Sequence, residues 1–186
     1  MTITIADKRT PIEPEEASRL LANAYANVMG RKPSVAILKL LIGQSALESG
    51  NWKQVHNYNF GNEKASSSDV YQQVYTFGDD PTDAGAYYAA FVTPEEGAEH
   101  YVHTLTKREH WRKGLESGKP LTFIEALSTP PVYFTADPMR YMATLVNRMD
   151  AYESFAKKYG ASILGIWIGA SVIILGGIAA GLAWKR

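Results

Sequence analysis

The chain contains no cysteine among its 186 residues. A disulfide framework, a thiolate metal site and a cysteine nucleophile are therefore excluded. Net charge is also missing, because 19 lysine and arginine residues balance 19 aspartate and glutamate residues. This balance, without blocks of like charge, argues against a nucleic-acid partner. The hydrophobic fraction of 46% excludes a disordered chain, and the length suits one medium-sized domain with an appendage.

Charge is wholly absent from residues 161–184, which read ASILGIWIGASVIILGGIAAGLAW. An apolar run longer than about 18 residues is typical of a transmembrane helix. At about 1.5 Å per residue the run reaches ~36 Å, enough to cross a hydrocarbon core of ~30 Å. Tyr159 and Trp184 bracket it as interfacial aromatic residues. A buried core helix is the alternative, but such a helix is rarely apolar on every face. We therefore expect residues 157–186 to form a C-terminal membrane anchor.

Two glycine pairs inside this run have the spacing that lets membrane helices approach closely, namely Gly165 with Gly169 and Gly177 with Gly181. They favour self-association of the predicted helix. Cations flank both ends of the run equally, so the orientation in the membrane stays open. Residues 1–10, MTITIADKRT, lack the basic and apolar regions of a signal peptide. The sequence therefore predicts a tail-anchored protein.

The rest of the chain predicts a mainly helical α+β domain over residues 14–156, preceded by a flexible segment over residues 1–13. Helical periodicity covers residues 14–28, and residues 34–49 form a helix that is apolar on nearly all sides. A helix without a polar face belongs in the middle of a domain.

One β-hairpin and three later helices complete the prediction. Residues 70–77 and 86–92 are rich in aromatic and β-branched side chains and are separated by the acidic turn GDDPTDAG. Helix starts are indicated by capping boxes at Thr93 and Thr122, and by Asp137 before a proline. The last helix is expected to continue towards the membrane.

Glu48 is the acidic residue that stands out on physical grounds. It closes the most apolar helix, where both burial and the partial negative charge of the helix C-terminus disfavour an ionised carboxyl group. Both effects raise the pKa towards the range that a general acid needs near neutral pH. Gly50 then allows the chain to turn and expose the helix end to a cleft. The alternative is that Glu48 is simply the first solvent-facing residue at a helix end.

Four sequence blocks strengthen the catalytic interpretation. They read ALESGNW at 46–52, NYNFGNEKA at 57–65, FVTPEEGAEHY at 91–101 and YFTADPMRY at 133–141. Their content and order resemble the lysozyme-like peptidoglycan glucosaminidases of glycoside hydrolase family 73, the flagellar and autolysin type. In that family a catalytic Glu in an A-x-E-S-G turn precedes an N-x-F-G-x-K loop. The Glu-Ser pair is also shared with goose-type lysozymes and lytic transglycosylases.

The resemblance implies a lysozyme-like fold and a peptidoglycan substrate. It makes Glu48 the general acid, and Tyr133 a cleft residue close to it. Asn59 and Phe60 match the loop that shapes the sugar-binding groove, and Ser49 belongs to the shared Glu-Ser pair. Aromatic candidates for sugar platforms, each with a core position as its alternative, are Trp52, Tyr58, Tyr75 and Tyr87.

The second carboxylate is where this sequence departs from the family pattern. In the resembled family it sits in the hairpin lobe, which makes Asp79 or Asp80 the candidate, with Asp83 a weaker one. Aspartates before a proline are also common turn formers. If neither acts, Glu48 serves first as acid and then as base while the substrate's N-acetyl group supplies the nucleophile. That is the chemistry of a lytic transglycosylase.

No cofactor is expected. His100 and His103 lie three apart on a predicted helix, but solvated histidines explain that spacing better than a metal site does. The sequence thus predicts a glycosidase that cleaves the β-1,4 bonds of bacterial peptidoglycan. Its organisation resembles the virion-associated lytic enzymes of membrane-containing bacteriophages, with a bacterial inner membrane facing the periplasm as the other location. A membrane-anchored structural or glycan-binding protein that lost turnover is the competing class.

Overall fold

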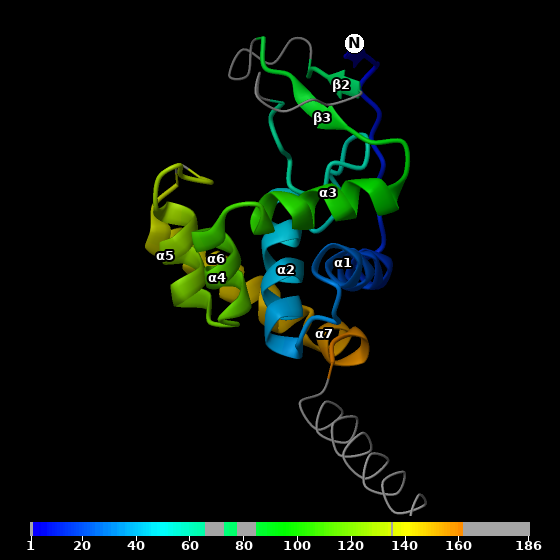
Figure 1. Cartoon of the computed structure of the whole chain (residues 1–186). Helices are drawn as coiled ribbons and strands as arrows, with labels where there is room; N and C mark the ends of the chain where they lie inside the picture. Colours follow the sequence, from blue (N-terminus) through cyan, green and yellow to red (C-terminus); the bar gives the residue numbers. More distant parts are fainter. Residues whose placement is uncertain (1, 66–72, 78–84, 135, 162–186) are drawn as a thin grey trace, which may run out of the picture.

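The computed structural model describes residues 2–65, 73–77, 85–134 and 136–161. Within them the chain forms a helical body with a small sheet at one end (Figure 1). This confirms the predicted mainly helical α+β class. The elements are β1 (Ile3–Thr4), α1 (Pro14–Met29), α2 (Val35–Glu48), β2 (Gln73–Tyr75), β3 (Tyr88–Ala90), α3 (Pro94–Thr106), α4 (Glu109–Glu116), α5 (Pro120–Ser128), α6 (Pro138–Ala151) and α7 (Glu153–Tyr159).

Helix α2 stands in the middle of the body, as its lack of a polar face predicts. It contacts α1, α4, α6 and α7, and Figure 1 shows these helices around it. Its residues from Leu40 to Ala46 are all buried. Ser34 caps its N-terminus by accepting a hydrogen bond from the Ile37 N–H at 3.3 Å. The helix thus forms the core of the domain and delivers its C-terminal residue, Glu48, to one end of that core.

Gly43 lets α6 pack closely against α2. A Cβ atom at Gly43 would lie 2.6 Å from Met149 Cγ and 3.2 Å from the Leu145 carbonyl oxygen. The C-terminal half of α6 therefore faces the middle of α2, while Tyr141 near the start of α6 reaches the α2 terminus. The two helices run antiparallel, and the glycine sets the distance between them.

The sheet has the order β1-β2-β3, with β1 parallel to β2 and β2 antiparallel to β3. The pairing of β2 with β3 confirms the predicted hairpin. Residues 66–72 and 78–84, the second of which covers most of the predicted acidic turn, lie outside the described residues.

The prediction that residues 1–13 form a flexible segment is wrong for the described residues 2–13. Ile3 and Thr4 extend the sheet beside Gln73 and Val74. Further along, backbone N–H groups of Thr10 and Ile12 donate to the carbonyls of Val55 and Trp52. A strand of two residues has no periodicity, so only the tertiary pairing reveals it.

The last helical stretch also differs from the prediction. Helix α6 ends at Ala151, and α7 packs separately against α1 and α2. Lys158 and Tyr159 both contact Glu15 of α1, and the Ala161 N–H donates to the Pro33 carbonyl at 2.8 Å. The folded body therefore extends past the predicted domain end at residue 156.

None of the helices in the described ranges is long and apolar enough to cross a bilayer. The predicted span over residues 161–184 lies, except for Ala161, outside the described residues, as do its glycine pairs.

The other helix starts are partly as predicted. Thr93 and Asp137 cap α3 and α6 through hydrogen bonds from the Glu96 and Arg140 N–H groups. The capping box predicted at Thr122 is wrong, since α5 begins at Pro120 with no side-chain cap. Helix α4 was not predicted, because it is short and opens without a capping side chain.

Candidate active site

Glu48 is the last residue of α2, and its carboxyl group is mostly buried. Burial raises its pKa above the ordinary value of 4.5, and a hydrogen bond from Tyr141 opposes part of this rise. The donor is the Tyr141 hydroxyl, 2.6 Å from Glu48 Oε1. The structure therefore gives Glu48 the desolvated environment that favours a carboxyl group holding its proton.

Three tyrosines surround this carboxyl group. Burial raises the pKa of the Tyr101, Tyr133 and Tyr141 hydroxyls above their ordinary value, and the nearby charge of Glu48 adds to each rise. All three hydroxyls therefore stay protonated near neutral pH and can act as hydrogen-bond donors. Tyr101 uses its hydroxyl on Gln44 Oε1, at 2.6 Å.

Glu48 opens onto two adjoining cavities. The larger, of about 860 Å³, is lined by Glu48, Gly61, Asn62, Glu63, Lys64, Thr104, Lys107, Arg108, Trp111, Pro131, Val132, Tyr133 and Phe134. The smaller, of about 320 Å³, is lined by Arg9, Glu48, Gln54, His56, Asn62 and Phe77. Both contain Glu48 and Asn62, so the acid lies where the two cavities meet. Ligand sites are typically about 300–1,000 Å³, so this groove has room for sugar units on either side of the acid.

The loop after α2 has an unusual backbone. Gly50, Asn51 and Trp52 all have positive φ values, of 57°, 57° and 58°, and Tyr58 and Asn62 follow with 55° and 48°. A large aromatic residue rarely adopts this left-handed region, and such conformations persist where the surroundings hold them. Hydrogen bonds of Ser45, Ser49 and Trp52 supply that constraint.

Ser45, Ser49 and Trp52 fix the reversal of the chain behind Glu48. The Trp52 indole N–H donates to Ser45 Oγ at 2.9 Å, and Ser45 Oγ donates to the Phe60 carbonyl at 3.0 Å. Ser49 Oγ donates to the Ser45 carbonyl and accepts from the Trp52 backbone N–H. Ser49 is thus a helix-end residue, and its hydroxyl is committed to the turn.

Trp52 is fully buried and packs against Tyr152, with ring centroids 5.1 Å apart. The prediction that it forms a sugar platform is therefore wrong, and its burial favours the core alternative. Phe60 is also fully buried, so it supports the groove loop from behind. Asn59 is buried as well and holds the loop closed, donating to the Glu63 and Ala89 carbonyls at 3.0 and 3.1 Å and accepting from the Glu63 N–H.

The remaining sequence candidates are scattered. Tyr133 lines the larger cavity near Glu48. Tyr58 is partly buried, and its carbonyl packs against Gly97 of α3. Tyr75 is fully buried in the sheet, which contradicts a sugar-platform role, whereas Tyr87 is exposed. Asp79, Asp80 and Asp83 lie outside the described residues.

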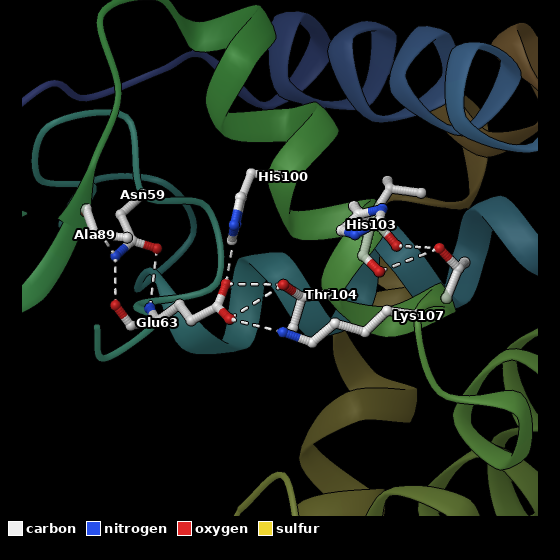
Figure 2. A network of polar contacts seen from close by, with 9 residues as sticks. Asn59, Glu63, Ala89, His100, His103, Thr104 and Lys107 are labelled. Carbon is white, nitrogen blue, oxygen red and sulfur yellow. Dashed lines mark hydrogen bonds and ion pairs between the residues drawn. The ribbon is translucent and has the colours of Figure 1, made fainter. Parts of the chain in front are cut away.

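A polar network centred on Glu63 forms part of the cavity wall (Figure 2). Its two carboxylate oxygens each lie 3.0 Å from Thr104 Oγ1, and one lies 3.1 Å from His100 Nδ1. Lys107 Nζ is 4.0 Å from the other oxygen. This network joins the loop over residues 59–65 to helix α3. Sequence reasoning did not single out Glu63, although it occupies the NYNFGNEKA block.

Sequence reasoning also missed three further residues of the site. Tyr141 contacts Glu48 directly, and the signal was its place on the buried stripe with Leu145 and Met149. Lys107 and Arg108 line the larger cavity. Their position depends on the α3–α4 junction, which the sequence did not predict.

Within the described ranges no group of three or more histidine, aspartate or glutamate residues is placed to hold a metal ion. His100 instead lies beside Glu63, and the exposed His103 lies three residues further along α3. Among the described residues, the larger cavity thus combines the carboxyl groups of Glu48 and Glu63 with aromatic and cationic side chains.

No family model matches the chain. No curated protein matches it either. Among solved structures it is similar to the glycoside hydrolase domain of FlgJ from Salmonella typhimurium, with a TM-score of 0.56 and 18% identity, covering 87% of this chain and 98% of that chain. At this identity the likeness shows a shared fold, and with the observed helical body and small sheet it confirms the predicted lysozyme-like architecture.

Proposed function

We propose that this protein is a glycosidase that cleaves the β-1,4 glycan strands of bacterial peptidoglycan, with Glu48 as the general acid. The observation that carries the proposal is the environment of the Glu48 carboxyl group. It is desolvated, held by Tyr141 at 2.6 Å, and located where two cavities meet. The fold shared with a glycoside hydrolase domain supports the same class of reaction.

The reaction begins with proton transfer. A glycan strand lying through both cavities places a glycosidic oxygen beside Glu48, which donates its proton as the bond to the anomeric carbon breaks. Tyr141 holds the carboxyl oriented and, by donating a hydrogen bond, stabilises the carboxylate that remains. Tyr133 and Phe134 line the cavity and supply apolar surface for the sugar faces.

Two routes complete the reaction. In a hydrolase a second carboxylate, for which Asp79 and Asp80 are the candidates, activates water or stabilises the cation. In a lytic transglycosylase Glu48 returns as the base and the N-acetyl group of the substrate closes on the anomeric carbon. Glu63 lines the cavity too, but both its oxygens contact Thr104. We therefore assign Glu63 to positioning the loop.

The decisive experiment compares Glu48→Gln with wild type on insoluble peptidoglycan, using the full chain in a mild detergent. Gln keeps the shape and can still accept from Tyr141, but it has no proton to give. We expect a loss of solubilising activity of at least about 100-fold, the usual size of general-acid catalysis. Glu95→Gln on the exposed first turn of α3 is the matched control. Wild-type activity in Glu48→Gln would refute the assignment.

Mass analysis of the products then identifies the bond and the route. Reducing GlcNAc ends indicate a glucosaminidase, reducing MurNAc ends a muramidase, and anhydro-MurNAc ends a transglycosylase. Loss of activity in Asp79→Asn or Asp80→Asn would identify the second carboxylate. Intact glycan that stays bound to wild-type protein would instead support the non-catalytic glycan-binding alternative.

The uncharged run over residues 161–184 supports a membrane-tethered form of the enzyme. We propose that the enzyme is located in the virion membrane of a bacteriophage, with the bacterial inner membrane as the other candidate location. In a test with vesicles, the full chain should resist extraction at high pH. The variant Leu175→Asp, which places a charge inside the apolar run, should be released more readily. Equal extraction of both would contradict the tether.

A further inference from the structure

The larger cavity carries more positive than negative charge on its wall. Its cations are Lys64, Lys107 and Arg108, and its carboxyl groups are Glu48 and Glu63. When Glu48 holds its proton, Glu63 is the one negative charge among these described lining residues. A neutral glycan does not require this excess, so the wall is suited to a substrate that brings negative charge with it.

Arg108 differs from the other two cations in its contacts. Lys107 lies 4.0 Å from Glu63, and Lys64 lies over the Tyr88 ring at 5.7 Å and has further interactions. The Arg108 guanidinium lies over the Trp111 ring, with its central carbon 5.2 Å from the ring centroid. Among the residues that the structure describes, no carboxylate pairs with Arg108. A guanidinium stacked on an indole keeps its N–H fork available for a planar anion.

The platform under Arg108 is rigid and connected to the catalytic acid. Trp111 is only 5% exposed, and its ring meets Tyr133 edge-on with centroids 5.6 Å apart. Tyr133 in turn lies close enough to Glu48 for the charge of that carboxyl group to help raise the pKa of the Tyr133 hydroxyl. Arg108 also opens α4 without a side-chain cap, so the first N–H groups of this helix receive no acceptor from it. The guanidinium and the proton donor therefore belong to one continuous wall.

We propose that Arg108, stacked on Trp111, binds a carboxylate of the muramyl unit of the substrate. This inference rests on the proposed function for its substrate class and adds the group that is recognised. In peptidoglycan the lactyl side chain of that sugar either ends in a carboxylate or is linked to a peptide stem that carries carboxylates. Chitin-like strands of GlcNAc alone have neither, so Arg108 distinguishes cell-wall glycan from uncharged glycan.

The test measures binding without turnover, so that its outcome is separate from that of the proposed function. The full chain carrying Glu48→Gln is sedimented with insoluble peptidoglycan, either untreated or with its carboxyl groups converted to amides by carbodiimide and methylamine. We expect Kd to be roughly threefold to tenfold lower for the untreated material, the size expected of a partly exposed charge-assisted pair. Adding Arg108→Gln should bring the ratio of the two Kd values close to one.

Arg112→Gln in the same background is the matched control. Arg112 lies one turn along α4 and pairs with Glu116, outside the lining of the cavity, so the ratio should stay at its parent value. Arg108→Lys keeps the charge without the planar fork and should give an intermediate ratio. Circular dichroism of each variant excludes unfolding as the cause.

Two results would overturn the proposal. One is an Arg108→Gln protein that keeps the parent's preference for untreated peptidoglycan, and the other is a parent protein with no such preference. Glycan strands stripped of their peptides by an amidase, which retain the lactyl carboxylate, separate the two sources of the anion. An effect of Arg108 that disappears on stripped strands assigns the stem peptide alone, and one that persists shows that Arg108 also binds the lactyl carboxylate.

Discussion

The Tyr141 hydroxyl donates a 2.6 Å hydrogen bond to Glu48 Oε1 across the antiparallel pair α2 and α6. The Tyr141 ring itself is stacked on Phe134, with centroids 4.0 Å apart and planes 3° from parallel. Phe134 belongs to the same cavity wall as Tyr133. A ring that is stacked on one side and anchored in a helix cannot swing freely, so its hydroxyl fixes the direction of the carboxyl group.

Tyr141→Phe is expected to change the pH dependence of the rate. The hydrogen bond from Tyr141 lowers the pKa of Glu48, whereas burial raises it. Removing the bond leaves burial unopposed, so the pKa rises further and the acid keeps its proton to higher pH. The high-pH limb of the rate profile therefore moves to higher pH. The maximal rate falls about threefold to tenfold because the carboxyl group is less well oriented. Initial rates of peptidoglycan solubilisation between about pH 4 and pH 9 measure both effects.

Tyr101→Phe is the control for this prediction. Its hydroxyl donates to Gln44 Oε1 at the same 2.6 Å distance in the same core, but not to Glu48. The variant should lose about 1 kcal/mol of stability, as expected for one net hydrogen bond, and leave the limb in place. If both variants moved the limb equally, the shift would reflect general loosening of the core.

The difference in stability between Glu48→Gln and wild type should change in favour of the variant as the pH rises from acidic to neutral. Folding raises the pKa of Glu48 above its ordinary value of 4.5. Below that value both states hold the proton. As the pH rises towards the folded-state pKa, the unfolded state releases the proton first, so stability is lost until that pKa is passed. Gln has no proton to lose and escapes this penalty.

Thermal unfolding of both proteins between about pH 4 and pH 8 tests this linkage. The difference in Tm, variant minus wild type, should grow with pH and then level off, by about 2–4 °C for each kcal/mol of linked free energy in a chain of this size. A difference that is constant with pH would mean that the pKa of Glu48 is the same in both states.

The location of Glu48 could be predicted from sequence because its causes are local. An apolar helix that ends at a carboxylate before a glycine encodes both burial and a turn within a few residues. The hairpin and the caps at Thr93 and Asp137 are local for the same reason, and they were predicted correctly.

The contacts that complete the site are not local. Tyr141 lies 93 residues from Glu48, and their contact depends on how closely α6 approaches α2 at Gly43. A glycine inside a helix does not reveal which partner it admits. Arg108 and Glu63 likewise meet in one wall only because α3 crosses the loop over residues 59–65. Trp52 was misassigned because an aromatic residue beside a catalytic turn has the same pattern whether it faces a sugar or the core.

Gly97→Ala is expected to destabilise the protein and displace the groove loop. A Cβ atom at Gly97 would lie 1.9 Å from the Tyr58 carbonyl oxygen, and backbone cannot move aside as a flexible side chain can. The positive φ of Tyr58 leaves that segment little freedom to adjust. Overpacking of this kind costs about 1–3 kcal/mol. Thermal unfolding followed by circular dichroism measures the loss.

His103→Ala, at an exposed position of the same helix, is the comparison and should leave Tm nearly unchanged. A Tm for Gly97→Ala equal to that of wild type would show that the loop can withdraw from α3 without cost.

Glu63→Gln tests whether the network in Figure 2 positions the groove loop or takes part in the reaction. Gln keeps an acceptor for Thr104 but loses the ion pair with Lys107 and the carboxylate that lies against His100. Because the Glu63 side chain is only 16% exposed, we expect a loss of about 1–3 kcal/mol in the free energy of unfolding. A double-mutant cycle with His100→Gln should give a coupling of about 0.5 kcal/mol or more, since the two groups are in direct contact.

The rate discriminates between the two roles of Glu63. As a positioning residue it holds Gly61 and Asn62 on the cavity wall, so Glu63→Gln should reduce the rate severalfold, leave the limbs of the pH profile in place and keep the products the same. If the Glu63 carboxylate instead activates water or stabilises the oxocarbenium-like transition state, Glu63→Gln should reduce activity as far as Glu48→Gln does. That outcome would make Glu63 the second carboxylate and remove the need for Asp79 or Asp80.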